Sequence, residues 1–158
     1  MRSEMSREKR PGLTKSEQLL LLLDVDREHA VMGRTRLAKL LFLVQKEILE
    51  TGKLGPEREG YEFRADRYGP FSDEIFDEIE FLSDEGLISR SGENENEAFQ
   101  ITDIGSKFVR ERILTRSSPA AIEEVKRLRT RYGSLPLSQL LQFVYTKYPE
   151  YAVKSVLH

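Results

Sequence analysis

The stretch over residues 86–105, GLISRSGENENEAFQITDIG, decides the fold class of this chain. Residues 87–90 and 98–101 are each typical of a short strand, and the tip between them is polar, with a glycine and two asparagines, so the stretch predicts a β-hairpin. Thr102 follows as the cap of a helix, because its side-chain oxygen can accept a hydrogen bond from the first backbone amides. A helix, a glycine, two short strands around a polar tip and another helix form the arrangement of a winged helix-turn-helix.

Apolar residues at helical spacing predict further helices on both sides of this hairpin. Before it we expect helices over residues 14–28, 35–50 and 72–85, and a short strand over residues 61–63. The caps of these helices are Thr14, which has Glu17 at capping-box spacing, Thr35 and Ser72. After the hairpin we expect helices that begin at Thr102, at Ser118-Pro119 and near Pro136. The predicted fold class is therefore mainly α with a small β-hairpin wing over residues 87–101, a winged-helix-like core and C-terminal helices over residues 118–158.

The composition is that of one globular domain. Of the 158 residues, 39% are hydrophobic and 33% are charged, which suits a packed core with a well-solvated surface. We expect a flexible tail over residues 1–12 and a single domain over residues 13–158. The chain has no cysteine, which excludes disulfides and thiolate metal sites. It shows neither a signal peptide nor an apolar run long enough to span a bilayer, so we expect a cytoplasmic protein without membrane contact.

No motif in the sequence predicts catalysis. The two histidines, His29 and His158, have no spaced metal ligand or nucleophile beside them. The glycines at positions 52, 55 and 60 do not form a phosphate-binding loop, because no strand precedes them and no Lys-Ser/Thr pair follows. We therefore expect a protein that is not an enzyme and that needs neither a metal ion nor a cofactor.

The net charge of −2 is unevenly distributed along the chain. Residues 72–105 contain eleven acids and one base, whereas residues 106–158 contain ten bases and four acids. In winged-helix proteins the helix before the hairpin enters the major groove of DNA. Here that helix, over residues 72–85, carries seven acids and no base, and phosphate would repel it. About twenty residues separate it from the previous helix, where a helix-turn-helix has roughly three or four. Standard DNA reading is disfavoured.

Two binding hypotheses remain open. The first is a protein-binding surface formed by the acidic helix and the aromatic segment before it, with Tyr61, Phe63, Arg64, Arg67, Tyr68, Asp77, Glu78 and Glu80. The second is nucleic-acid binding through basic helices, with Arg34, Arg36, Lys39, Lys126, Arg127, Arg129 and Arg131. The simpler alternative is that the aromatic residues pack in the core and the charges lie on solvated helix faces. A homodimer suits both hypotheses, since the acidic and basic segments are complementary.

Three segments resemble a known family. RLAKLLF at residues 36–42, YGPFS at 68–72 and FLSDEGLI at 81–88 are similar to the YwgA-like proteins of archaea and bacteria, and YPEYA at 148–152 fits the same pattern. More distantly, they resemble the phage-associated Panacea domain, which occurs in toxin-neutralising antitoxins and in a proteolytic adaptor. The resemblance implies a helical, winged-helix-related fold, no enzyme activity and, through the Panacea domain, protein binding. Residues 101–105, ITDIG, also resemble the L-T-x-x-G step after the wing of many winged-helix regulators, in which the glycine allows close packing. We therefore expect a non-catalytic regulatory module that binds protein rather than reading DNA in the standard way.

Overall fold

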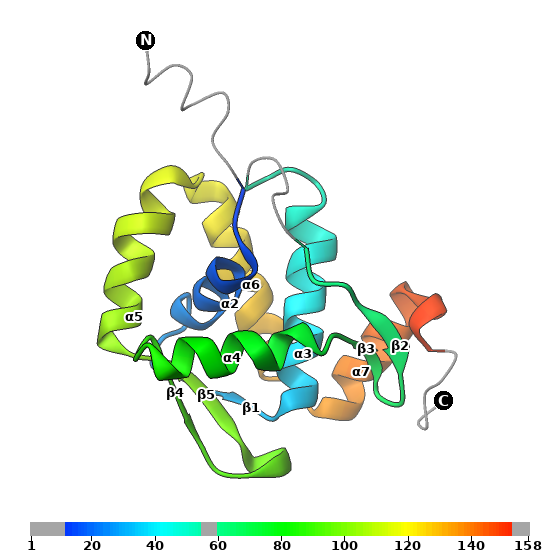
Figure 1. Ribbon diagram of the computed structural model, residues 1–158. Helices are drawn as coiled ribbons and strands as arrows, with labels where there is room; N and C mark the ends of the chain where they lie inside the picture. Colours follow the sequence, from blue (N-terminus) through cyan, green and yellow to red (C-terminus); the bar gives the residue numbers. More distant parts are fainter. Residues whose placement is uncertain (1–11, 55–59, 153–158) are drawn as a thin grey trace.

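The computed structural model describes residues 12–54 and 60–152 (Figure 1). These residues form six α-helices, several π-helical and 3-10 turns, and two small antiparallel sheets. The prediction of a mainly helical chain with a small hairpin is confirmed. Of the flexible tail expected over residues 1–12, residues 1–11 lie outside the described residues, and Gly12 is buried. No helix in the two described ranges is long and apolar enough to cross a lipid bilayer.

Two central helices supply most of the core. Helix α2 (Lys15–Asp24) begins at the expected capping box, in which the Thr14 hydroxyl accepts from the Glu17 amide and the Glu17 carboxylate accepts from the Thr14 amide. All five leucines at positions 19–23 are buried, so α2 is enclosed on every side. Helix α3 (Arg34–Val44) is similar, since residues 37–44 are all buried. It continues into a π-helical turn, η1 (Gln45–Leu49).

Several expected helix boundaries are wrong. Helix α2 ends at Asp24 and not at residue 28. Helix α3 begins after Gly33 and not at Thr35, because Gly33 adopts a φ of 90° and its amide donates to the Glu97 carbonyl, which fixes the direction of the chain. Helix α4 (Glu74–Asp84) has Asp73 as its N-cap, while Ser72 is buried one residue earlier.

The predicted hairpin is confirmed by β4 (Ile88–Ser91) and β5 (Ala98–Ile101), which pair antiparallel with Ile88 opposite Ile101. A 3-10 turn, η2 (Asn94–Asn96), lies at its tip. A third strand, β1 (Val31–Met32), joins the other edge of β5 and gives the order β1-β5-β4. This strand was not predicted, because two residues are too few for a periodic signal. The sheet packs on α2 through β5.

A second hairpin precedes α4. Its strands are β2 (Arg64–Asp66) and β3 (Gly69–Phe71), with Arg64 opposite Phe71 and Asp66 opposite Gly69. The strand predicted over residues 61–63 is therefore misplaced by a few residues. The return strand β3 comes from the YGPFS segment at residues 68–72. This hairpin contacts both α3 and the C-terminal part of the chain.

The C-terminal third is helical, as predicted. Helix α5 (Asp103–Phe108) begins at Thr102, whose hydroxyl accepts from the Gly105 amide, and continues into η3 (Val109–Ile113) and η4 (Leu114–Arg116). Helix α6 (Pro119–Gly133) begins at the Ser118 cap, and α7 (Leu137–Lys147) ends before a 3-10 turn, η5 (Pro149–Tyr151). A Cβ added at Gly105 would overlap the carbonyl oxygen of Leu87, so this glycine does permit close packing of α5 on the sheet. Helices α4 and α6 pack on opposite sides of the central pair: α4 crosses in front and α6 runs behind (Figure 1).

Candidate functional site

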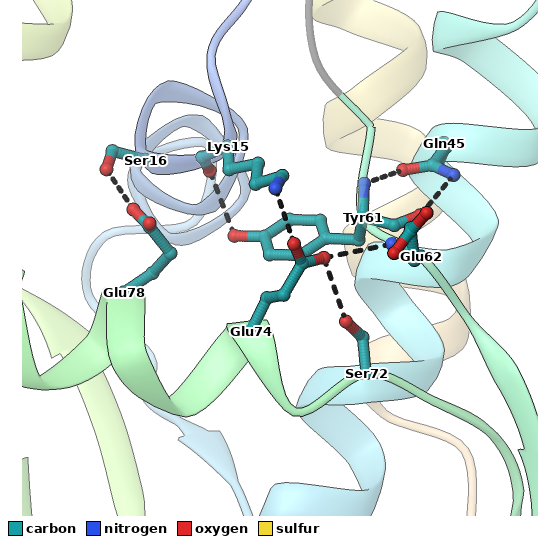
Figure 2. Close-up of polar contacts among 8 residues, drawn as sticks. All are labelled: Lys15, Ser16, Gln45, Tyr61, Glu62, Ser72, Glu74 and Glu78. Carbon is teal, nitrogen blue, oxygen red and sulfur yellow. Dashed lines mark hydrogen bonds and ion pairs between the residues drawn. The ribbon is translucent and has the colours of Figure 1, made fainter.

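Tyr61 is buried at the centre of a polar network (Figure 2). Its hydroxyl donates to the Lys15 carbonyl at 3.0 Å. Its amide donates to Gln45 Oε1 at 2.7 Å, and its carbonyl accepts from Gln45 Nε2 at 3.0 Å. Tyr61 thus ties the start of α2 to η1 and holds the chain that leads to α4. The simpler alternative, core packing, holds for this residue, which was a candidate for the binding surface.

Glu74 joins the same network from the first turn of α4 (Figure 2). Its carboxylate accepts from Lys15 Nζ at 2.6 Å, from the Glu62 amide at 3.0 Å and from Ser72 Oγ at 3.3 Å. Burial raises the pKa of the Glu74 carboxyl, but these hydrogen bonds outweigh it and hold the pKa below its ordinary value. Glu78, one turn later, accepts from the Ser16 hydroxyl. These contacts fix the rotation of α4 about its axis.

The solvent side of α4, opposite the buried stripe of Ile75, Ile79 and Leu82, carries the acids that make no such contacts. Asp77, Glu80 and Asp84 are exposed, Glu85 follows at the C-cap, and Phe81 lies among them with 55% of its surface exposed. Across residues 12–54 and 60–152 the ion pairs of this segment are made by Glu74 and Asp73 alone. Like charges at this helical spacing destabilise a helix by about 0.2–0.5 kcal/mol per pair. We call this surface the acidic face; it comprises Asp77, Glu80, Phe81, Asp84 and Glu85.

The β2–β3 hairpin divides the other predicted residues between surface and core. Arg64 is exposed and pairs with Asp73 at 3.2 Å, beside the start of α4. Arg67 and Tyr68 are exposed at the turn. Phe63 is half-buried, and its ring packs edge-on against the ring of Phe42 with 5.1 Å between centroids. The surface part of the predicted set is therefore Arg64, Arg67, Tyr68, Asp77 and Glu80.

Two of the predicted nucleic-acid-binding residues are buried, so their assignment to a basic surface is wrong. Lys39 is 1% exposed, and its ammonium group donates to the Pro70 carbonyl at 2.9 Å. Burial lowers the pKa of Lys39 to about 7, although the charge of Asp66 opposes the shift. Arg129 is 3% exposed and donates to carbonyl oxygens at the end of α2, with Leu22 O at 2.8 Å. Both side chains therefore hold buried backbone carbonyls and are not available to bind a nucleic acid.

The other predicted cations divide into two groups. Arg36 donates to two backbone carbonyls near the end of α6, at 2.7 and 3.2 Å. Arg34 and Arg90 both bond the buried carboxylate of Glu97, at 2.7 and 2.6 Å, and so anchor the tip of the β4–β5 hairpin to α3. Burial opposes ionisation of Glu97, but these two bonds outweigh it and hold the pKa of the carboxyl below its usual value. Only three predicted cations, all on α6, remain exposed without such a role: Lys126, Arg127 and Arg131.

Sequence reasoning missed Phe81 as a surface residue. Its signal was available, because Phe81 lies off the buried stripe formed by Ile75, Ile79 and Leu82. Within the described residues no three histidine, aspartate or glutamate side chains gather closely enough to hold a metal ion.

No family model matches this chain, and no curated protein matches it significantly. The resemblance to the YwgA-like and Panacea proteins stays a prediction. Function must therefore be inferred from the chain's own geometry.

Proposed function

We propose that this chain is a non-catalytic regulatory module that binds another protein through the acidic face of α4. One observation carries the proposal. Four exposed carboxylates without an ion pair among the described residues surround an exposed phenylalanine on a helix whose opposite side packs into the core through Ile75, Ile79 and Leu82. A lone surface phenylalanine is ordinary, but one among like charges without ion pairs marks a surface that a basic partner would stabilise.

We further propose that the fold is related to the winged helix. The order α2, β1, α3, α4, β4, β5, with β1 added beside β5, supports this relation. The chain departs from the simple motif by inserting η1 and the β2–β3 hairpin between α3 and α4. Helix α4 then occupies the position of a DNA-reading helix, where its acids oppose phosphate. The alternative is nucleic-acid binding through basic helices. It is weakened because Lys39 and Arg129 are buried, and it is supported by three exposed cations on α6.

The chemistry of the face defines the partner. Its carboxylates fit lysine or arginine side chains, and Phe81 fits an apolar side chain between them. Burying the exposed half of a phenylalanine contributes on the order of 1 kcal/mol, and the charges speed association at low salt. The expected partner segment is thus basic with an apolar residue at its centre.

The experiment places a photo-crosslinking amino acid at position 81 and, as a control, at exposed Gln142 on α7. A protein captured from position 81 alone is purified and titrated by calorimetry. Asp77→Lys with Glu80→Lys should weaken binding at least tenfold, and rising salt should weaken wild-type binding. Reversal of two exposed acids elsewhere, Glu111→Lys with Glu150→Lys, makes the same charge change and should leave binding intact. Equal binding by both double variants would refute the assignment of α4.

A mobility-shift titration tests the nucleic-acid alternative. On mixed-sequence duplex DNA at low salt we expect no binding. Salt-sensitive binding that is lost in Lys126→Ala with Arg127→Ala would instead favour DNA as the partner.

A further inference from the structure

Helix α6 and the η1 segment border an open groove of about 590 Å³. Pockets of roughly 300–1,000 Å³ hold drug-sized ligands, so the groove has room for an aromatic side chain and its neighbours. Two apolar side chains of α6 line it, the buried Leu128 and the half-buried Tyr132. The ring of Tyr132 is held by stacking on Phe143, with 4.6 Å between centroids.

Exposed cations surround this apolar lining. Lys126, Arg127 and Arg131 all belong to α6 and all line the groove. Arg131 lies over the Tyr132 ring, 5.5 Å from its centroid. In the part of the chain that the structure describes, none of the three has an ion pair; the nearby pairs use other residues.

The acids that line the groove are mostly neutralised by lysines of the same chain. Glu124 pairs with Lys53 at 2.9 Å, and Glu47 pairs with Lys147 at 2.7 Å. Glu123 is exposed and adds one negative charge. Three free cations therefore face one free carboxylate, and an occupant with acidic side chains is favoured.

The groove and the acidic face lie on opposite sides of the molecule. Helix α4 packs against α2 from one side, and α6 packs against α2 and α3 from the other (Figure 1). One molecule cannot place its own α4 in its own groove. Two molecules can do so, head to tail, and each contact then leaves one acidic face and one groove free. Such a heterologous contact continues into a chain or closes into a ring.

We propose that the groove binds the acidic face of a second copy of this chain. Phe81 of one copy enters beside Leu128 and Tyr132 of the next, and its flanking carboxylates meet the cations of α6. This inference rests on the proposed function, because it names an occupant of the same face. Self-association covers the face, so a basic partner must compete with a second copy and binds best when the protein is dilute.

Sedimentation velocity of the full chain over a concentration series, at low and high salt, tests this contact. Wild type should associate at low salt and dissociate as salt rises. Reversal on α4, Asp77→Lys with Glu80→Lys, and reversal on α6, Lys126→Glu with Arg127→Glu, should each raise the dissociation constant at least tenfold. The Glu111→Lys with Glu150→Lys control should associate as wild type does.

Mixing the two reversed proteins provides the sharper readout. In the mixture each reversed α4 meets a reversed groove, and each native α4 meets a native groove, so association should return toward the wild-type level. Recovery cannot come from misfolded variants. A wild type that stays monomeric at low salt, an α6 reversal without effect, or a mixture without recovery would each overturn the proposal. If the self-association tests fail but α4 reversal still weakens binding of the crosslinked partner at least tenfold, the proposed function stands without self-association. If α4 reversal leaves that binding intact as well, both proposals are refuted.

Discussion

Replacing the buried Lys39 by methionine should stabilise the protein at neutral pH, and the gain should shrink as the pH rises. Lys39 lies in α3 with 1% of its surface exposed, and the Pro70 carbonyl accepts from its ammonium group. Burial lowers its pKa from 10.5 to about 7, and the charge of Asp66 limits the shift. Methionine keeps most of the length of the side chain and removes the charge.

The magnitude follows from the shift. Each pKa unit corresponds to about 1.4 kcal/mol, so the lowered pKa costs the folded state on the order of 4 kcal/mol at pH 7. Methionine leaves the Pro70 carbonyl without this donor, which costs about 1–3 kcal/mol. The net expectation for Lys39→Met at pH 7 is a gain of about 2 kcal/mol. The cost of the lysine is complete below about pH 7 and absent above 10.5, because in that window the unfolded chain binds the extra proton.

Urea unfolding followed by circular dichroism at pH 7, 8 and 9 measures this difference. The advantage of Lys39→Met should fall by up to about 1.4 kcal/mol per pH unit across the series. Lys126→Met, at an exposed position of α6, is the matched control and should differ little from wild type at each pH. An advantage that stays constant with pH would refute the reasoning, because it would mean that the Lys39 amine reaches water.

Three further changes test contacts that hold the fold, each by urea unfolding. Gly105→Ala should cost about 1–3 kcal/mol, because its Cβ overlaps the Leu87 carbonyl, and wild-type stability would show that α5 can shift. Glu97→Gln should cost about 1–2 kcal/mol at pH 7 by weakening its bonds to Arg34. Since the folded pKa of Glu97 is lowered, this loss should fade as the pH falls through that pKa; a loss that persists in acid would contradict the ionic contribution. Arg129→Met should cost on the order of 3 kcal/mol, because buried carbonyls lose their donor; a near-neutral effect would show that water replaces it.

Local chemistry made much of the fold predictable. The Thr14 capping box, the Ser118-Pro119 start and the Thr102 cap each depend on residues within one helical turn, and all three are confirmed. Thr35 failed as a cap because Gly33 takes this role, and its amide donates to the Glu97 carbonyl near the tip of the distant β4–β5 hairpin. No local pattern contains that contact.

The candidate site was predictable in part for the same reason. Asp77 and Glu80 are exposed because helical spacing sets them opposite the buried stripe of α4. The burial of Lys39 and Arg129 could not be predicted, since their acceptors are 31 and 107 residues away in the chain. A lysine or arginine outside the apolar stripe of its helix is expected to be solvated, unless the backbone carbonyl that accepts its hydrogen bond is known. The burial of Tyr61 likewise depends on distant partners, because its amide donates to Gln45 and its hydroxyl donates to the Lys15 carbonyl.

The contact between Arg129 and the end of α2 has a consequence during synthesis. The Leu22 carbonyl cannot form its hydrogen bond until Arg129 has been synthesised, 107 residues later. Ribosomes add roughly 5–20 residues per second, so the wait lasts roughly 5–20 seconds. Throughout that time five consecutive leucines, buried in the finished protein, lack α6, one of the helices that cover them. The nascent chain should therefore be a client of ribosome-associated chaperones, and stalled chains that stop short of α6 should be held by them or aggregate.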